Sequence, residues 1–238
     1  MGKMFDVLSL RSLYNFDQIG KNQESYVWSE KQANPDALAT VRIIFKNGNI
    51  SYISSSLLKE MQNAYRVNEK GLLKLRKICD GVLFLDRGDE HYLVVLEVKS
   101  GFKEVKSKAI LQIPASYVKI KSILNDFSNY KDGDYKELGL IISYPYVKYA
   151  QTDSENNHVV IDNKLAMIGD KNEIVTSKYI KSLQNTNVVE FDGHDFEFDS
   201  LIDVKPELLF NKLKVIHNSV DNNCVNAVVD LDKVIEKL

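Results

Sequence analysis

The chain has 238 residues, 44% of them hydrophobic and 27% charged, with a formal net charge of −2, which is ordinary for a globular protein with one large core. Two cysteines exclude a four-cysteine metal cluster and a secreted disulfide scaffold, and no apolar run approaches the roughly 18 residues of a membrane span. The first residues show no long apolar stretch and no small-residue cleavage site. We therefore expect no secretory signal, no membrane partner and a cytoplasmic location.

Charge is distributed unevenly along the chain. Residues 151–238 contain 9 Lys and no Arg against 16 Asp and Glu, whereas residues 1–150 contain 22 basic and 17 acidic residues. This asymmetry is compatible with a nucleic-acid-facing half, although it is weak evidence alone.

The first third of the chain is predicted to be a lead-in followed by a hairpin and a helix. Residues 1–37 are expected to be helical or irregular. Residues 39–54 are predicted to form a β-hairpin with Asn47-Gly48 in its turn. A helix is expected to begin at Leu57, with Ser55 or Ser56 as its cap.

The middle of the chain has the clearest pattern. Residues 81–85 and 92–99 are apolar on both faces, which is typical of buried central strands, and a polar turn joins them. Residues 103–127 are predicted to be helical, and Pro114 is expected to kink this helix or to start a second one. Residues 138–146 are predicted to form a short buried strand.

The last third is less distinctive. Residues 158–163 are predicted to form a strand, and residues 188–199 a hairpin. Residues 205–217 and 225–238 are predicted to be terminal helices, and we expect this acidic part to pack as a cap on the core.

Two acidic side chains meet in the central hairpin. A two-residue turn at Gly88-Asp89 and a four-residue loop both place Asp80 directly opposite Glu97, with Cβ atoms ~4.5–5.5 Å apart. Two carboxylates in a buried sheet cannot both ionise cheaply, and a divalent cation such as Mg²⁺ or Mn²⁺ resolves the conflict. Lys99 lies on the same face as Glu97, while Val98 points away. An ammonium there can orient a water molecule or lower its pKa, so the set suits phosphodiester hydrolysis.

The stretch KICDGVLFL…YLVVLEVKSG resembles the PD-(D/E)XK nuclease superfamily, although Cys79 stands where the family motif has its proline. The resemblance implies metal ligands at Asp80 and Glu97, with help from the Val98 carbonyl, and catalysis by Lys99. It also implies a restriction-endonuclease-like α/β fold with an α-β-β-β-α-β core and a mixed central sheet flanked by helices. We expect one domain, with this core at residues 56–144, residues 1–55 as an N-terminal addition and residues 145–238 as an acidic C-terminal extension.

The resemblance also suggests further site residues. The LEVKSG ending is similar to the RecB-type branch, in which a glutamine on the next helix precedes a tyrosine, and Gln112 and Tyr117 are the candidates. The family often adds an acid from the preceding helix. Glu60 is our candidate ligand and Glu69 the alternative, and a solvated helix residue is an equally good interpretation of Glu60.

Basic residues flank the predicted site, and they would favour a polyphosphate partner. The candidates for nucleic-acid contact are Arg76, Lys103, Lys106 and Lys108. Further lysines follow at Lys119 and Lys121, and this second group also fits a solvated helix face.

The sequence therefore predicts a Mg²⁺- or Mn²⁺-dependent DNA nuclease that serves restriction, phage defence or repair. Two alternatives stay open: a nuclease-like fold that binds nucleic acid or protein without turnover, and an RNA nuclease, since the site chemistry does not distinguish the sugars. A homodimer or a partner protein is also left open.

Overall fold

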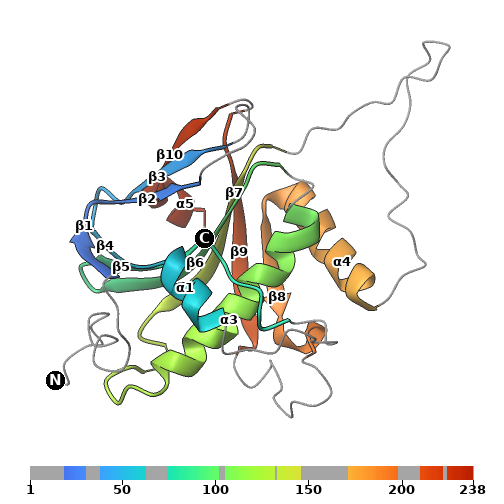
Figure 1. The fold of residues 1–238 in the computed structure, drawn as a ribbon, viewed down its shortest axis with the longest axis horizontal. Coiled ribbons are helices and arrows are strands. Elements are labelled where there is room, and N and C mark those ends of the chain that lie inside the picture. Colours follow the sequence, from blue (N-terminus) through green and yellow to red (C-terminus); the bar gives the residue numbers. More distant parts are fainter. Residues whose placement is uncertain are drawn as a thin grey trace.

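The computed structural model describes residues 19–30, 38–62, 74–101, 105–131, 133–145, 171–197, 210–221 and 224–237. These residues form a mixed α/β fold built on two mixed sheets (Figure 1). The large sheet consists, in spatial order, of β1 (Ile19–Gln23), β4 (Asn49–Ser54), β5 (Gly81–Arg87), β6 (Glu90–Lys99), β7 (Lys136–Ser143), β9 (Lys212–Ser219) and β8 (Val188–Asp192). The small sheet consists of β10 (Asn226–Asp230), β3 (Thr40–Ile44) and β2 (Ser25–Ser29).

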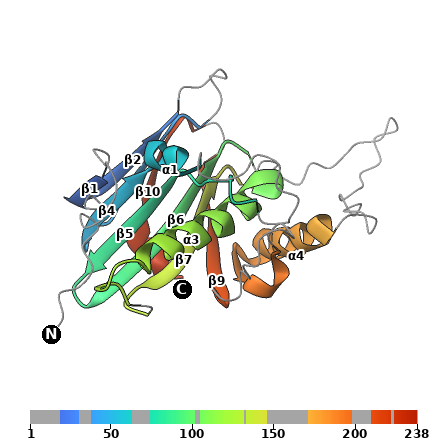
Figure 2. The same cartoon turned by 60° about the horizontal axis from the view of Figure 1, so that its bottom comes forward.

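Helices cover one face of the large sheet and the small sheet covers the other. On the helical face lie α1 (Ser55–Gln62), α3 (Ile110–Leu124) and α4 (Lys171–Thr186), and Figure 2 shows α3 crossing the strands, while α4 packs beside β8. The opposite face packs against the small sheet and against α5 (Leu231–Ile235). The alternation of strand side chains therefore supplies two separate hydrophobic cores, one on each side of the sheet.

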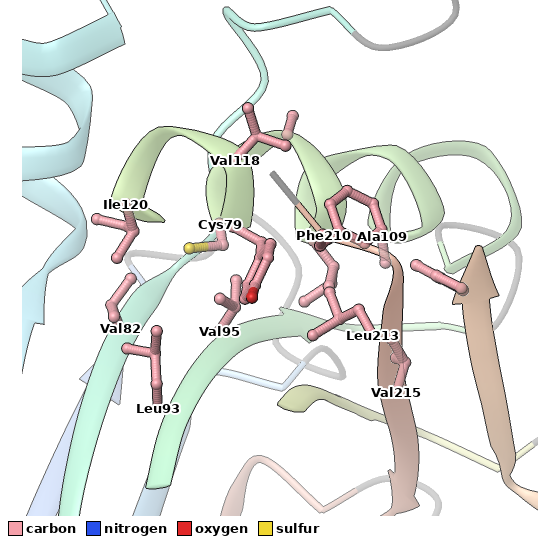
Figure 3. Close-up of a cluster of buried hydrophobic side chains, with 14 of the residues drawn as sticks. Cys79, Val82, Leu93, Val95, Ala109, Val118, Ile120, Phe210, Leu213 and Val215 are labelled. Atoms are coloured by element: carbon pink, nitrogen blue, oxygen red, sulfur yellow. The ribbon is translucent and has the colours of Figure 1, made fainter. Parts of the chain in front are cut away.

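The central strands β5 and β6 are buried on both faces, as predicted. Val82 of β5 and Val95 of β6 belong to the core under α3, whereas Leu83 and Val94 belong to the core shared with the small sheet. Figure 3 shows Val82 and Val95 pointing toward α3. A side chain at Gly139 of β7 would clash with Ile113 of α3, since an added Cβ would lie 2.7 Å from the Ile113 Cγ2 atom. The glycine thus lets α3 pack closely on the sheet.

The sheet changes from antiparallel to parallel pairing at β6. The strands β1, β4, β5 and β6 pair antiparallel, whereas β6, β7 and β9 pair parallel. The carboxyl ends of the parallel strands therefore share one edge of the sheet, and this edge is a common place for ligands in open α/β sheets.

The predicted core order differs from the structure in one respect. Within the described part of residues 56–144 the order is helix, two strands, helix and strand. The third antiparallel strand next to this pair is β4, which precedes α1 instead of following it. The specific α-β-β-β-α-β order is therefore not confirmed within the described residues, although the mixed α/β class is confirmed.

The predicted hairpin at residues 39–54 is wrong, although both of its strands form. The first strand, β3, joins the small sheet between β10 and β2, while β4 joins the large sheet between β1 and β5. The reason lies at Gly48, where an added Cβ would lie 2.2 Å from the Asp86 carbonyl oxygen. The glycine therefore permits close packing on β5 rather than a hairpin turn.

Several other predicted elements need correction. The lead-in contains β1 and β2, and α1 begins at Ser55, so the predicted serine caps lie inside the helix or at its first residue. The helical run is divided at the π-helical turn η2 (Val105–Ala109), upstream of Pro114, which lies inside α3. The predicted strand at residues 158–163 lies outside the described residues.

The C-terminal part completes both sheets instead of capping them. Residues 212–219 are β9 rather than a helix, and β8 pairs with β9 instead of forming the predicted hairpin. A short 3₁₀ turn, η3 (Gly193–Asp195), follows β8. Residues 226–230 are β10, and only α5 is helical in the last described segment. Pairing between strands that are far apart in the sequence leaves no local signal. The helix-like pattern of these residues therefore gave the wrong prediction.

Candidate active site

The register predicted for the β5–β6 hairpin is confirmed. Its ladder runs from Arg87 opposite Glu90 to Gly81 opposite Leu96, and Gly88 in the turn has a φ of 60°. Asp80 immediately precedes this ladder, and its N–H donates to the Leu96 carbonyl at 2.9 Å. Asp80 therefore lies beside Glu97, just before β5 begins and where β6 continues along β7.

The three predicted side chains lie close together next to the start of β5. Period-two alternation places Glu97 and Lys99 on the side of Val95, which is the face under α3, and the Asp80 carboxylate adjoins them at the Val98 N–H. The ammonium of Lys99 forms an ion pair with Oε1 of Glu97. Pairing within one hairpin and alternation along one strand are thus enough to bring two acids and a lysine together.

The Asp80 carboxylate is held by a hydrogen bond from the backbone of β6. Its Oδ2 atom accepts a hydrogen bond from the Val98 N–H at 2.8 Å. A residue in a strand directs its N–H and its carbonyl to the same neighbour, so the Val98 carbonyl also points to the side of Asp80. This backbone oxygen therefore lies on the same side of β6 as Asp80. The sequence predicts it as a metal ligand.

Glu97 is the most unusual group in the site. Its side chain is 0% exposed, and its buried Oε2 atom has no hydrogen-bond partner among the described residues. Burial raises the pKa of Glu97 well above its ordinary value, and the nearby Asp80 carboxylate raises it further, while Lys99 opposes both. A buried carboxylate oxygen without a donor is costly unless a cation completes its coordination.

The carboxyl of Asp80 responds to the same burial. Desolvation raises the pKa of Asp80, and the charge of Lys99 and hydrogen bonds from the Val98 N–H and the Trp28 side chain act in the opposite direction. Trp28 is buried in β2 of the small sheet. The second sheet therefore helps to position Asp80, and no local pattern around the single tryptophan indicates this role.

Helix α3 fastens the segment that leads into Asp80. The amide nitrogen of Gln112 donates to the Ile78 carbonyl at 2.7 Å, and Oγ of Ser116 accepts from the Cys79 N–H at 2.7 Å. The Ile78 carbonyl can only accept, so the Gln112 Oε1 atom faces elsewhere, and no described residue bonds to this buried oxygen. The structure thus places Gln112 and Ser116 against the segment that precedes Asp80, and the catalytic role of Gln112 stays a prediction.

Lysines gather around the carboxylate pair. Burial lowers the pKa of Lys77, and so do the neighbouring charges of Lys74, Lys108 and Lys99, while Glu97 opposes them. Lys74 and Lys108 are exposed, and Lys77 is half-buried. Lys108 is one of the predicted contacts to nucleic acid, and Lys77 belongs to the basic run before Asp80 that was predicted to flank the site.

The remaining basic candidates differ in their placement. Arg76 is half-buried in the turn that precedes Asp80. Lys103 and the side chain of Lys106 lie outside the described residues. Lys119 and Lys121 are each 2% exposed, so they do not form the solvated helix face that was one interpretation of this stretch.

Two acids beside the core have less support from the geometry. Glu60 is exposed on α1, and Glu69 lies outside the described residues. Within the described part of the chain, no three acidic, histidine or cysteine side chains lie close enough together to hold a metal ion. Glu60 as a third ligand therefore stays a prediction that this arrangement does not support by proximity.

Tyr117 faces the core rather than the carboxylates. It is 1% exposed, and its hydroxyl donates to Glu137, at the opposite end of the β6–β7 pair from Glu97. Packing is the role that the structure gives it. Cys79 is also buried under α3, where Figure 3 shows it beside Val82, and burial raises the pKa of its thiol to about 12.

The oxygen atoms at this edge suit a hard divalent cation. They are the Asp80 carboxylate, the buried Oε2 of Glu97 and the predicted third ligand, the Val98 carbonyl. Mg²⁺ and Mn²⁺ prefer such oxygen ligands, and Mg²⁺ commonly uses one or two carboxylates with water in its other positions. The residues therefore fit the predicted ion by their chemistry.

Comparisons of this chain with models of protein families, with curated proteins and with solved structures found no match. Among the described residues, no helix is both long and apolar enough to cross a bilayer.

Proposed function

We propose that this chain is a metal-dependent nuclease that hydrolyses phosphodiester bonds in DNA. The observation that carries the proposal is Glu97, a fully buried carboxylate whose Oε2 atom has no hydrogen-bond partner within the part of the chain that the structure describes. It lies beside Asp80 and is paired with Lys99. A structural role alone would leave an expensive buried acid with one unsatisfied oxygen, whereas a metal site gives that oxygen a function.

Each residue has a defined role in this proposal. Asp80 and Glu97 would hold Mg²⁺ or Mn²⁺, together with the Val98 carbonyl. The bound ion would neutralise charge on the phosphoryl group and lower the pKa of a water molecule. Lys99 would orient the attacking water and stabilise the developing negative charge, because its ammonium lies on the same face beside Glu97. Gln112 would hold the Asp80 segment through the Ile78 carbonyl.

The lysines around the site support a polyanionic substrate. Lys77, Lys99 and Lys108 lie close enough for their charges to interact, and only the Glu97 charge opposes them at Lys77. Such a cluster gains affinity for nucleic acid by releasing counterions from phosphates. The cluster does not distinguish DNA from RNA, and DNA is the proposed substrate because of the resemblance described above.

A panel assay tests the activity. Wild-type protein and Lys99→Ala, purified in parallel, are incubated with linear, circular and single-stranded DNA and with RNA, in Mg²⁺, Mn²⁺ or EDTA. We expect metal-dependent cleavage by wild type and a loss of about 10²-fold or more in the variant, the size typical of losing a positioned polar or acid–base group. Lys131→Gln, an exposed lysine after α3, should cleave like wild type.

Three outcomes would contradict the proposal or change it. Equal cleavage by wild type and Lys99→Ala would indicate a contaminant. Binding of DNA without cleavage in any metal would favour the alternative of a nuclease-like binding module. Cleavage of RNA alone would replace the proposed substrate.

A further inference from the structure

Helix α3 carries two buried lysines with different partners. Lys121 donates to Oε1 of Glu137 at 2.6 Å and to the Tyr130 hydroxyl at 3.0 Å, in a side-chain network away from the site. Lys119 instead donates to two backbone carbonyls, those of Leu75 at 2.7 Å and Lys77 at 2.6 Å. Lys119 therefore fastens the chain that leads into Asp80.

Three side chains of α3 act on the same segment. Gln112, Ser116 and Lys119 follow one another at spacings of four and three residues, so they share one face of the helix. Their contacts reach the Ile78 carbonyl, the Cys79 N–H and the carbonyls of Leu75 and Lys77. The segment of residues 75–80 has no helix or strand of its own, so these bonds take the place of regular structure.

A buried ammonium is an expensive way to hold a turn. Moving a charged group out of water costs several kcal/mol before its partners compensate, and a well-packed apolar side chain is often as stabilising. The bond to the Leu75 carbonyl is buried and the bond to the Lys77 carbonyl is partly buried, so these two oxygens depend on the ammonium of Lys119 for a donor. Both bonds end on the same turn, so Lys119 fixes the position of the turn as well as satisfying its carbonyls.

We propose that Lys119 is a positioning residue, whose hydrogen bonds to the Leu75 and Lys77 carbonyls hold Asp80 in the geometry that binds the metal ion. This inference rests on the proposed function for its consequence in catalysis. Lys119 does not touch the reacting groups. It acts through the backbone of residues 75–80, which ends at Asp80 with its carboxylate on the Val98 N–H.

The test is Lys119→Met, which keeps the length and the apolar stem of the side chain but removes its donors. Amide hydrogen exchange at Cys79 and Val98 reports the position of the segment directly, because these amides bond to Ser116 and Asp80. We expect both to exchange at least about tenfold faster. Mn²⁺ affinity measured by calorimetry should fall about 10- to 100-fold, as on loss of an outer partner of a metal ligand.

Lys121→Met is the matched control, because it removes a buried lysine from the same helix. It breaks the pair with Glu137, so unfolding should become easier. In the folded state, however, its Mn²⁺ affinity and its local exchange at Cys79 and Val98 should equal those of wild type. Ser116→Ala provides a milder variant, should Lys119→Met not fold, and its effects should have the same direction.

The inference is overturned if Lys119→Met or Ser116→Ala folds and keeps wild-type exchange at Cys79 and Val98, or if Lys121→Met shows the same changes in affinity. Failure of the proposed function has a different signature. Wild-type protein that binds no Mn²⁺ would refute the metal site, while faster exchange in Lys119→Met alone would still show that the lysine fixes the segment.

Discussion

The carboxylate of Asp80 accepts a hydrogen bond from the Val98 N–H at 2.8 Å, so a side chain extends the hydrogen bonding of the sheet beyond the start of β5. Asp80 thus has a structural role and a proposed chemical role, and the two can be separated. Asp80→Asn keeps an acceptor oxygen for Val98 and loses the charge, whereas Asp80→Ala loses both.

We expect Asp80→Asn to retain nearly the full free energy of unfolding but to lose most of its affinity for Mn²⁺. Asp80→Ala should lose the affinity and also about 1–3 kcal/mol of stability, because the Val98 N–H is left without its partner. Urea denaturation and calorimetry of both variants check this. Equal stability of the two variants would contradict the structural role of the carboxylate.

The register of this hairpin could be predicted from the sequence because a short turn fixes every pair on two adjacent strands. The same reasoning failed at Asn47-Gly48. A two-residue hairpin turn of type I′ requires positive φ at both central residues, and among the described residues neither has it. Gly48 is needed instead for its contact with Asp86, a residue 38 positions away, which no local pattern reveals.

Burial of individual charges was equally hidden from the sequence. Three lysines look alike along the predicted helix at residues 103–127. In the structure Lys108 is exposed, whereas Lys119 and Lys121 are buried. Their roles depend on partners in other elements, such as the Leu75 carbonyl and Glu137. Trp28 reaches Asp80 from the small sheet for the same reason, so the supporting residues of the site emerge only from the tertiary structure.

Metal binding should stabilise the folded chain. At a Mn²⁺ concentration 100 times the dissociation constant, we expect wild type to gain about 2.7 kcal/mol of unfolding free energy over protein in EDTA. Glu97→Gln should show little of this gain, because the amide replaces the charged ligand. Urea midpoints with Mn²⁺ and with EDTA measure the difference, and an equal gain in wild type and variant would place the ion elsewhere.

The charge of Lys77 should strengthen DNA binding. If its ammonium contacts a phosphate, Lys77→Gln should weaken binding of short duplexes of any sequence and reduce the slope of log affinity against log salt concentration by about 1. Fluorescence anisotropy in EDTA, where no cleavage is expected, measures this slope. Lys131→Gln removes the same charge from an exposed position after α3, and it should leave the slope unchanged. Equal slopes for wild type and Lys77→Gln would exclude such a contact.

A buried histidine in the neighbouring strands should make the fold sensitive to acid. His217 of β9 is 4% exposed, and its Nε2 atom lies 2.8 Å from Oγ of Ser143, which is paired with Lys99 across β7 and β6. Burial lowers the pKa of His217 from 6.5 to about 4. The native state therefore holds the neutral ring over a range in which the unfolded chain binds a proton.

The sign of the effect follows from linkage. The stability is fully present above pH 6.5 and is lost as the pH falls toward 4, by about 3 kcal/mol over the full range. His217→Gln keeps a polar side chain near Ser143 but cannot take up the proton, so its unfolding free energy should fall less over this range. His194→Gln removes an exposed histidine on η3 and should follow wild type. Urea midpoints at about pH 8, 6.5, 5 and 4, which span the two pKa values, give the dependence of stability on pH for wild type and both variants. If wild type and His217→Gln lose stability in parallel, the acid sensitivity arises from other groups. The native state would then not depend on a neutral His217.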